Sequence, residues 1–334
     1  MFNKLYEKTK PLIKKITPFL IILITFFILT MNLPYYISAP GGLINTKEKI
    51  NESIKTKGSL NMTYVSEMHA NIPTLFWALI DKNWDIEKEK DTVTGHESIE
   101  DLQYRNKMLL KEANCNALKV AYENSNVKYE ITNTKIYITY IDDLSKTNLK
   151  VGDQIIKVDG KKINSKESLY KLIQNKKIGQ KVYFNVLKDG KEETKYATLI
   201  DVNGKPKVGA LVTNTFDLKS NKKITFNFKD SESGPSGGLM LALTIYSSLN
   251  NIDLTHGKTI AGTGTIEENG DVGPISGVKY KLIGAYDKGA QIFLVPDGEN
   301  YKEAKKVKEE KGYDIDIVPV KNFKEALKYL ENLS

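Results

Sequence analysis

Ser236 lies in a turn rich in glycine and proline that leads directly into an apolar helix. The turn covers residues 233–238, and the apolar run 239–246 follows it without a break. Residues 224–228, which favour a β-strand, precede the turn. The start of a helix carries unpaired backbone N–H groups and the positive end of the helix dipole, and both stabilise a developing oxyanion. The pattern therefore predicts that Ser236 is a nucleophile.

Two runs downstream of this turn complete a family pattern. Residues 260–266 contain a Thr-Gly strand, and residues 270–285 contain Gly-Pro-Ile-Ser-Gly followed by Val-Lys-Tyr-Lys. With the Gly-Pro-Ser-Gly-Gly turn, they resemble the Lon-type serine-lysine proteases, whose catalytic lysine opens the next helix. The resemblance implies that Ser236 is the nucleophile and that Lys279, at the family's spacing from it, is the base.

A lysine acts as a base only when it is neutral, so its pKa must fall well below about 10.4, and burial supplies that shift. Lys279 has apolar neighbours in sequence. We expect Thr263 to hold the lysine amine, and we expect the amides around Gly234 and Gly237 to support the oxyanion. Lys281 is the runner-up base, but it lies two residues further on and is expected to point elsewhere on the helix.

The middle of the chain resembles a bacterial PDZ domain. The pattern Leu-Lys-x-Gly-Asp-x-Ile-x-x-Val-Asp-Gly starts at Leu149, between a predicted strand at 136–141 and a predicted helix at 165–174. The resemblance implies that a peptide adds as a strand between these two elements. The candidate peptide-binding residues are Lys135, Ile136, Tyr137 and Ile138. A Gly-Leu-Gly-Phe type of loop is absent from this region, so a preference for free C-termini does not follow.

The N-terminal part predicts a membrane anchor. Lys10, Lys14 and Lys15 precede an uncharged run from residue 16 to residue 44, which is long enough for a transmembrane helix. The lysines predict a cytoplasmic N-terminus and a catalytic region outside the cell membrane, with a single span. The alternative is a cleaved signal peptide, but Pro40 follows Ala39 at the point where cleavage is expected.

The predicted fold class is α+β, with an N-terminal transmembrane helix, a small β-barrel-like PDZ domain with helices and a Lon-type α/β proteolytic domain. The predicted boundaries are 1–42 for the cytoplasmic stub, anchor and turn, 43–125 for the first part of the protease region, 126–200 for the PDZ domain and 201–334 for the catalytic part. The PDZ domain is either inserted into the protease domain or arranged in tandem, with 43–125 as a separate cap.

The predicted function is an ATP-independent endopeptidase that cleaves extended peptides or unfolded proteins of the cell envelope, with the PDZ domain recruiting or gating the substrate. The formal charge of +8 is weak support for nucleic-acid binding, because Arg105 is the only arginine. We expect no metal and no cofactor, and a P-loop is excluded because Ile252 replaces its first glycine. The alternatives are an inactive PDZ scaffold and a regulator that holds another envelope protease.

Overall fold

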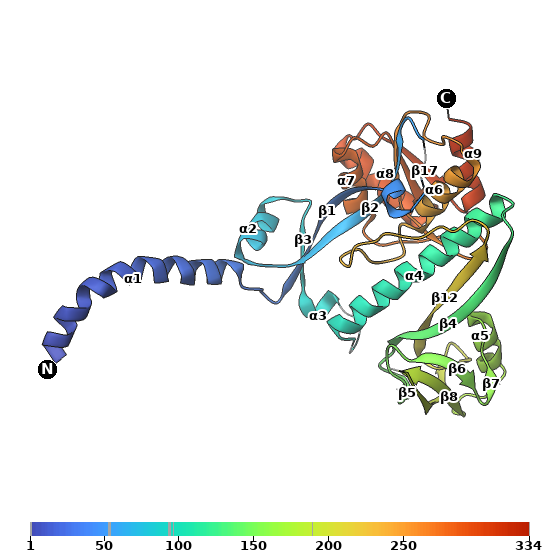
Figure 1. The fold of residues 1–334 in the computed structure, drawn as a ribbon, viewed down its shortest axis with the longest axis horizontal. Helices are drawn as coiled ribbons and strands as arrows, with labels where there is room; N and C mark the ends of the chain where they lie inside the picture. The colour runs from blue at the N-terminus through green and yellow to red at the C-terminus, as the bar shows by residue number, and fades with distance from the viewer. Residues whose placement is uncertain (1, 53–54, 93–94, 96, 189, 334) are drawn as a thin grey trace. The chain divides into compact units, whose positions relative to one another are not determined.

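The computed structural model describes residues 2–52, 55–92, 95, 97–188 and 190–333, and the chain divides into two compact units (Figure 1). Unit 1 consists of residues 1–40 and 65–92, and unit 2 consists of residues 41–64 and 93–334. Two strands, β1 (Tyr35–Asn45) and β2 (Ser59–His69), each begin in one unit and end in the other.

Unit 1 follows local sequence patterns. Helix α2 (Ile72–Ile80) begins in a capping box, in which the Asn71 side chain accepts from the Thr74 amide while the Asn71 amide donates to the Thr74 hydroxyl. The first residues of β1 pair antiparallel with β3 (Asp85–Lys88). Unit 1 also contains α1 (Phe2–Thr30) and α3 (Glu89–Thr92). Its small buried core consists of Ile37, Ala70 and Ala78.

The prediction of an N-terminal transmembrane helix is wrong. Among the residues that the structure describes, no helix combines the length and the apolar character that crossing a bilayer requires. The uncharged part of α1 begins after Lys15 and the helix ends at Thr30, so this part rises about 22 Å at 1.5 Å per residue, whereas the hydrocarbon core is about 30 Å thick. The uncharged run in the sequence is longer only because it continues into β1.

The centre of unit 2 is a sheet of parallel strands. β13 (Thr259–Gly262) pairs with the first residues of β2 on one side and with β16 (Ile292–Pro296) on the other, and β17 (Asp316–Val320) pairs with β16. Parallel neighbours need a crossover connection. Helix α7 (Val278–Asp287) precedes β16, and helix α8 (Glu299–Lys311) connects β16 to β17. A short antiparallel pair, β14 (Thr265–Ile266) and β15 (Val272–Gly273), follows β13.

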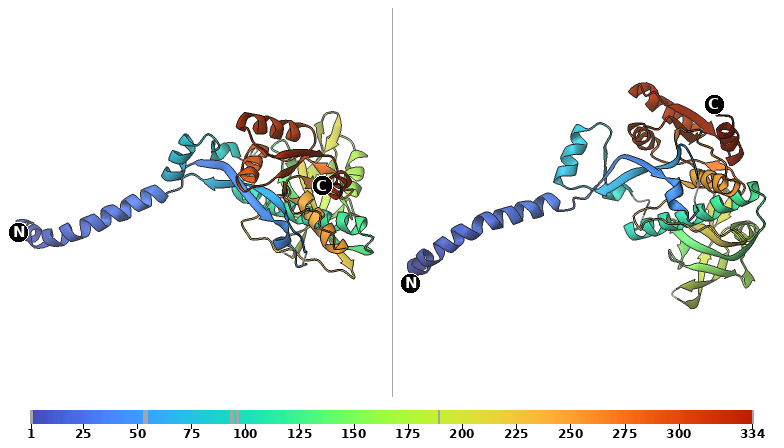
Figure 2. Two further views of the ribbon diagram at one scale, coloured as in Figure 1. Left: turned by 90° about the horizontal axis from the view of Figure 1, so that it is seen from above. Right: turned by 45° about the horizontal axis from the view of Figure 1, so that its top comes forward.

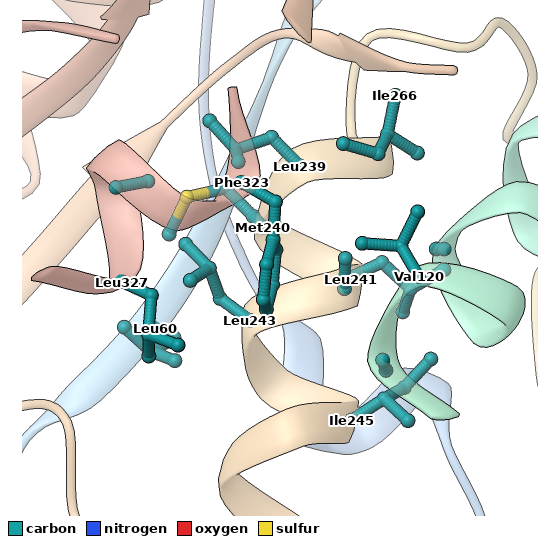
Figure 3. Close-up of a cluster of buried hydrophobic side chains, with 14 of the residues drawn as sticks. Leu60, Val120, Leu239, Met240, Leu241, Leu243, Ile245, Ile266, Phe323 and Leu327 are labelled. Atoms are coloured by element: carbon teal, nitrogen blue, oxygen red, sulfur yellow. The ribbon is translucent and has the colours of Figure 1, made fainter. Parts of the chain in front are cut away.

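Helices cover both faces of this sheet. Successive strand residues point to opposite sides, so β13 contributes side chains to the core on each face. Ile260 of β13 joins the core that contains α6 (Gly238–Asn250), whereas Ala261 joins the core that contains α7 and α8. Helix α6 is buried nearly all round, as its continuous apolar sequence predicts. Figure 3 shows its side chains packed among residues of neighbouring elements: Leu60, Val120, Ile266, Phe323 and Leu327. The last two of these belong to α9 (Phe323–Glu331).

A second, antiparallel sheet has its own hydrophobic core. Its order is β12-β4-β6-β8-β9-β5, with β7 paired to β6. The strands are β4 (Tyr129–Ile141), β5 (Lys146–Thr147), β6 (Gln154–Val158), β7 (Lys161–Lys162), β8 (Lys181–Lys188), β9 (Lys191–Thr198) and β12 (Ala210–Ser220). Helix α5 (Lys166–Gln174) packs on this sheet through Leu169 and Ile173. A separate hairpin of β10 (Ile200–Val202) and β11 (Lys205–Lys207) precedes β12.

Helix α4 (Ile99–Asn124) contacts both the core that contains α6 and the second sheet (Figure 2). Ala117, Val120 and Ala121 of its second half lie in the core beneath α6. The same helix packs against β4 and β12 of the second sheet. The core that contains α6 therefore combines residues that precede the second sheet in the sequence with residues that follow it. The domain boundaries at 43–125, 126–200 and 201–334 stay predictions.

The mixed helix and strand content agrees with the sequence prediction. The predicted strand at 136–141 lies in β4, and the predicted helix at 165–174 is α5 with Ser165 as its N-cap. The predicted strand at 224–228 is wrong: only Phe226 makes an isolated bridge, to Ile50, and the rest of the segment is irregular. Its alternating apolar residues still face the core, since Ile224 is buried.

Asp253, in the turn between α6 and β13, stabilises that turn through hydrogen bonds to its carboxylate, and substitution of this residue tests their contribution. Its carboxylate accepts from the amides of Lys57 and Thr255 and from the Thr255 hydroxyl. Burial acts to raise the pKa of Asp253, but these hydrogen bonds outweigh burial and the pKa is lowered. We expect Asp253→Asn to reduce the free energy of unfolding by about 1–3 kcal/mol at pH 7.

A lowered carboxyl pKa stabilises the folded state above the ordinary value of 3.8, and that contribution is lost as the pH falls through the lower folded-state pKa. The difference between Asp253→Asn and wild type should therefore shrink below about pH 3.8. Urea unfolding between pH 7 and pH 2.5 measures this difference. The exposed Asp314→Asn is the control. A penalty for Asp253→Asn that does not change with pH would contradict the charged hydrogen bonds.

Candidate active site and peptide groove

Ser236 lies in the turn directly before α6. The N-cap of α6 is Gly237, so the hydroxyl of Ser236 is one residue outside the helix, near its positive end. The Ser236 carbonyl accepts from the Gly264 amide at 2.7 Å and from the Thr263 hydroxyl at 3.2 Å. These two residues come directly after β13. The end of β13 therefore fixes the position of the serine.

Some backbone amides near the predicted oxyanion site already donate hydrogen bonds to other groups. The Gly234 amide donates to the Asn106 carbonyl of α4 at 2.9 Å, and Gly234 has φ +87°, a conformation that favours glycine. The Gly238 amide donates to the Pro235 carbonyl at 3.1 Å. Gly234 is thus a residue that shapes the loop. The amides of Ser236 and Gly237 are left as the candidate oxyanion donors.

Thr263 is fully buried, and its hydroxyl donates to the Ser236 carbonyl. This contact differs from the predicted one, in which Thr263 holds the lysine amine. Thr263 acts on the backbone of the nucleophile.

The predicted base, Lys279, is the second residue of α7 and is partly exposed. Its Nζ lies 5.2 Å from the ring centroid of the adjacent Tyr280. Its amide donates to Glu303 Oε1 of α8 at 3.2 Å, so its backbone ties α7 to α8.

Lys281 is buried, with 5% of its surface exposed. It lies on α7 between the buried residues Val278 and Ala285, one turn away on either side. Burial disfavours the charged form of an amine, which is the condition that a lysine base needs. Lys279 and Lys281 are two residues apart, which is about 200° around a helix, so they face different surroundings. The sequence predicts Lys281 only as the second candidate for the base. The two lysines are distinguished by the direction in which each side chain points around the axis of α7.

Helices α6 and α7 cover opposite faces of β13. Ser236 precedes α6, whose side chains pack on the face that contains Ile260. Helix α7 packs through Val278 and Leu282 on the face that contains Ala261. The two halves of the predicted site therefore share one central strand.

The predicted peptide edge at Lys135–Ile138 is not a free edge. Ile136 pairs with Asn214 of β12 on one side and with Ile155 of β6 on the other, and Tyr137 is likewise paired on both sides. Ile136 and Ile138 are also buried. Backbone groups that already pair with two neighbours cannot accept a third strand. Lys135, Ile136, Tyr137 and Ile138 therefore do not form a site for strand addition.

An apolar cavity of about 460 Å³ lies beside β12, which is an edge strand of the second sheet. Its walls are Ala210, Leu211 and Val212 of β12 and Leu169, Tyr170 and Ile173 of α5. The β10–β11 hairpin lines a third side. The sequence pattern does not predict this strand as the peptide edge, because β12 follows the PDZ pattern by many residues and pairs with β4 at long range.

A partly buried ion pair fixes both walls of this cavity to α4. Glu112 Oε1 accepts from Lys166 Nζ of α5 at 2.5 Å and from the Asn214 amide of β12 at 2.9 Å. Burial raises the pKa of Glu112 even though Lys166 and the Asn214 amide act to lower it. Burial acts to lower the pKa of Lys166, but the Glu112 carboxylate outweighs burial and the pKa is raised. The Asn214 amide is thus unavailable to an added strand.

Two parts of the chain match known protein families. Residues 120–199 match the PDZ domain, and residues 229–332 match the Lon protease (S16) C-terminal proteolytic domain. The second match contains Ser236, Thr263, Lys279 and Lys281. Together with the Lon protease relatives, it supports a serine-type peptidase.

The curated relatives are similar over about a third of the chain or less. The Lon protease of Rickettsia bellii is 35% identical over 96 residues, which are 29% of this chain and 12% of the relative. Lon protease 2 of Borreliella burgdorferi is 32% identical over 118 residues, which are 34% of this chain and 14% of the relative. The matched region thus spans only 12–14% of the length of these relatives.

A solved structure is similar to a part of the chain. The PDZ domain of an SdrC-like protein from Listeria monocytogenes is 26% identical, with a TM-score of 0.23, over 25% of this chain and 92% of that one.

Proposed function

We propose that this chain is a serine endopeptidase in which Ser236 is the nucleophile and Lys281 is the general base. The single observation that supports it most is a serine tethered to the end of β13 while a lysine is buried on the helix across the same strand. Lys279, the base predicted from the sequence, is partly exposed and is a poorer candidate.

The proposed reaction is acyl transfer followed by hydrolysis. Neutral Lys281 Nζ takes the proton of Ser236 Oγ as the oxygen attacks the scissile carbonyl carbon, and the carbonyl oxygen becomes an oxyanion. The amides of Ser236 and Gly237 stabilise that oxyanion beside the start of α6. The Lys281 ammonium then gives its proton to the leaving amine. A water molecule repeats the sequence on the acyl-enzyme and releases the acid.

We propose that the substrates are extended peptides or unfolded protein segments and that the cleavage needs no ATP. Hydrolysis by a serine and a lysine consumes only water, whereas nucleotide energy is needed to unfold a folded substrate. The experiment incubates the full chain with an unfolded protein and a peptide library, without nucleotide, and reads the products by mass spectrometry. Cleavage by wild type and no cleavage by Ser236→Ala is the expected result. Equal cleavage by both would refute the proposal.

We also propose that the groove between β12 and α5 binds a peptide that carries an apolar side chain. The outer edge of β12 suits strand addition near Ala210 and Val212, and the adjoining cavity suits an apolar group. Such binding recruits or gates the substrate of the peptidase. The observation also favours the second candidate function, a peptide-binding scaffold, and cleavage by wild type distinguishes the two.

Leu211→Glu is expected to weaken peptide binding at least about tenfold, because it places a charge in an apolar groove. Leu211 lines the cavity yet is 54% exposed, so the fold should tolerate the change. Fluorescence polarisation with a peptide selected from the library measures the affinity. Ile178→Glu is the matched control, since Ile178 is also exposed and does not line the cavity. Unchanged affinity in Leu211→Glu would exclude this groove.

A further inference from the structure

A partly buried ion pair lies next to the turn that carries Ser236. Lys49, at the end of η1 (Thr46–Lys49), places its Nζ 2.7 Å from Glu232 Oε1 and 2.8 Å from Glu232 Oε2. The side chains of Lys49 and Glu232 are only 7% and 18% exposed. A charge buried to this extent is destabilising unless its partner is present, so each residue holds the other in place.

Lys49 holds the segment before the turn at more than one point. Its carbonyl accepts from the Asn227 amide at 2.9 Å, and its Nζ lies 5.5 Å from the ring centroid of Phe228. Glu232 Oε2 also accepts from the Lys229 amide at 2.7 Å, which closes the chain between Lys229 and Glu232 into a compact turn. One lysine thus fixes the direction in which the chain enters the nucleophile loop, residues 229–236.

Among the residues that the structure describes, two other tethers hold the nucleophile loop, and both use the backbone of the loop. The Gly234 amide donates to Asn106, and the Ser236 carbonyl accepts from Thr263 and Gly264. The pair of Lys49 and Glu232 is the ionic tether, and only residues 233–235 separate it from the serine. Side-chain substitution can therefore remove this tether while the backbone contacts remain.

We propose that Lys49 and Glu232 are positioning residues that act as one unit to hold Ser236 Oγ in its reactive geometry. Neither is a catalytic residue, since both act through the nucleophile loop. The inference rests on the proposed function of Ser236. A nucleophile displaced by about 1 Å loses about a hundredfold in rate, so a tether this close to the serine has a measurable effect on the chemical step.

The test uses the full chain with Lys49→Met, Glu232→Gln and the double variant. Two rates are measured: covalent labelling of Ser236 by a fluorophosphonate, located by mass spectrometry, and hydrolysis of a fluorogenic peptide. Each single variant is expected to lower the labelling rate and kcat about 10- to 100-fold, with KM within about twofold. The double variant is expected to be no slower than the slower single variant, because the residues act as a unit. Lys49→Arg keeps the charge and is expected to recover part of the rate.

The controls separate positioning from stability. Glu232→Gln keeps the shape of the side chain, and all rates are measured at least about 15 °C below the melting temperature of each variant, where the folded state predominates. Lys302→Met removes an exposed ion pair with Glu299 and is expected to leave both rates unchanged. Wild-type rates in both single variants would overturn the inference, and so would losses that multiply in the double variant. A wild-type chain that neither labels nor cleaves would instead overturn the proposed function and, with it, this inference.

Discussion

Lys281→Met should lower kcat for peptide hydrolysis at least about a thousandfold, to the level of Ser236→Ala. The substitution removes the proposed proton acceptor and replaces it with an apolar side chain of similar length, which suits a site that is only 5% exposed. Lys279→Met should keep kcat within about threefold of wild type, because the Lys279 side chain is partly exposed and its link to α8 is made by the backbone amide. Initial rates with a fluorogenic peptide measure both effects.

The two lysine variants are matched controls for each other, since each removes one positive charge from the first turn of α7. Circular dichroism and thermal unfolding show whether each variant is folded. Loss of activity in Lys279→Met with activity retained in Lys281→Met would restore the base predicted from the sequence. Activity in both variants would exclude a lysine of α7 as the base.

The nucleophile turn could be predicted from the sequence because its determinants are local. Glycine and proline set the backbone of residues 233–238, and the apolar run that follows can only be a buried element. Helix α5 was predictable for the same reason, because Ser165 and Ser168 form a capping box at its start. In both places the information lies within a few residues of the element.

The identity of the base could not be predicted in the same way. Lys279 and Lys281 share apolar neighbours in sequence, and the family spacing favours Lys279. Only the rotational phase of α7 shows which side chain is buried, and the packing of α7 on β13 and α8 sets that phase. A spacing counted along the chain also changes when the turn between α6 and β13 changes length.

The peptide edge was mispredicted because strand pairing is non-local. The sequence around Ile136 predicts a strand but does not show how many neighbours that strand has. Its second neighbour is β12, which is remote in sequence. The transmembrane prediction failed for a related reason. A count of uncharged residues does not show that α1 ends at Thr30 and that β1 begins at Tyr35.

Gly284→Ala is expected to destabilise the chain by about 1–3 kcal/mol, although helix propensity alone favours alanine by about 1 kcal/mol. A Cβ atom on Gly284 would lie 2.9 Å from the carbonyl carbon and oxygen of Gly41 and 3.1 Å from the Gly42 nitrogen. These are backbone atoms of β1, which cannot rotate away as a side chain can. Helix α7 must therefore shift outward to accept the methyl group. Urea unfolding measures the change.

The sign of this effect tests how closely α7 approaches β1. The exposed Lys305 of α8 gives the reference, since Lys305→Ala should be more stable than Lys305→Gly by about 1 kcal/mol. The reverse order at position 284 would show that contact with the β1 backbone outweighs propensity. Because Gly284 lies one turn after Lys281, the same shift should lower kcat about tenfold or more while the fold persists. If Gly284→Ala were instead more stable than wild type and fully active, α7 would have room to spare, and its distance from β1 would not set the position of the base.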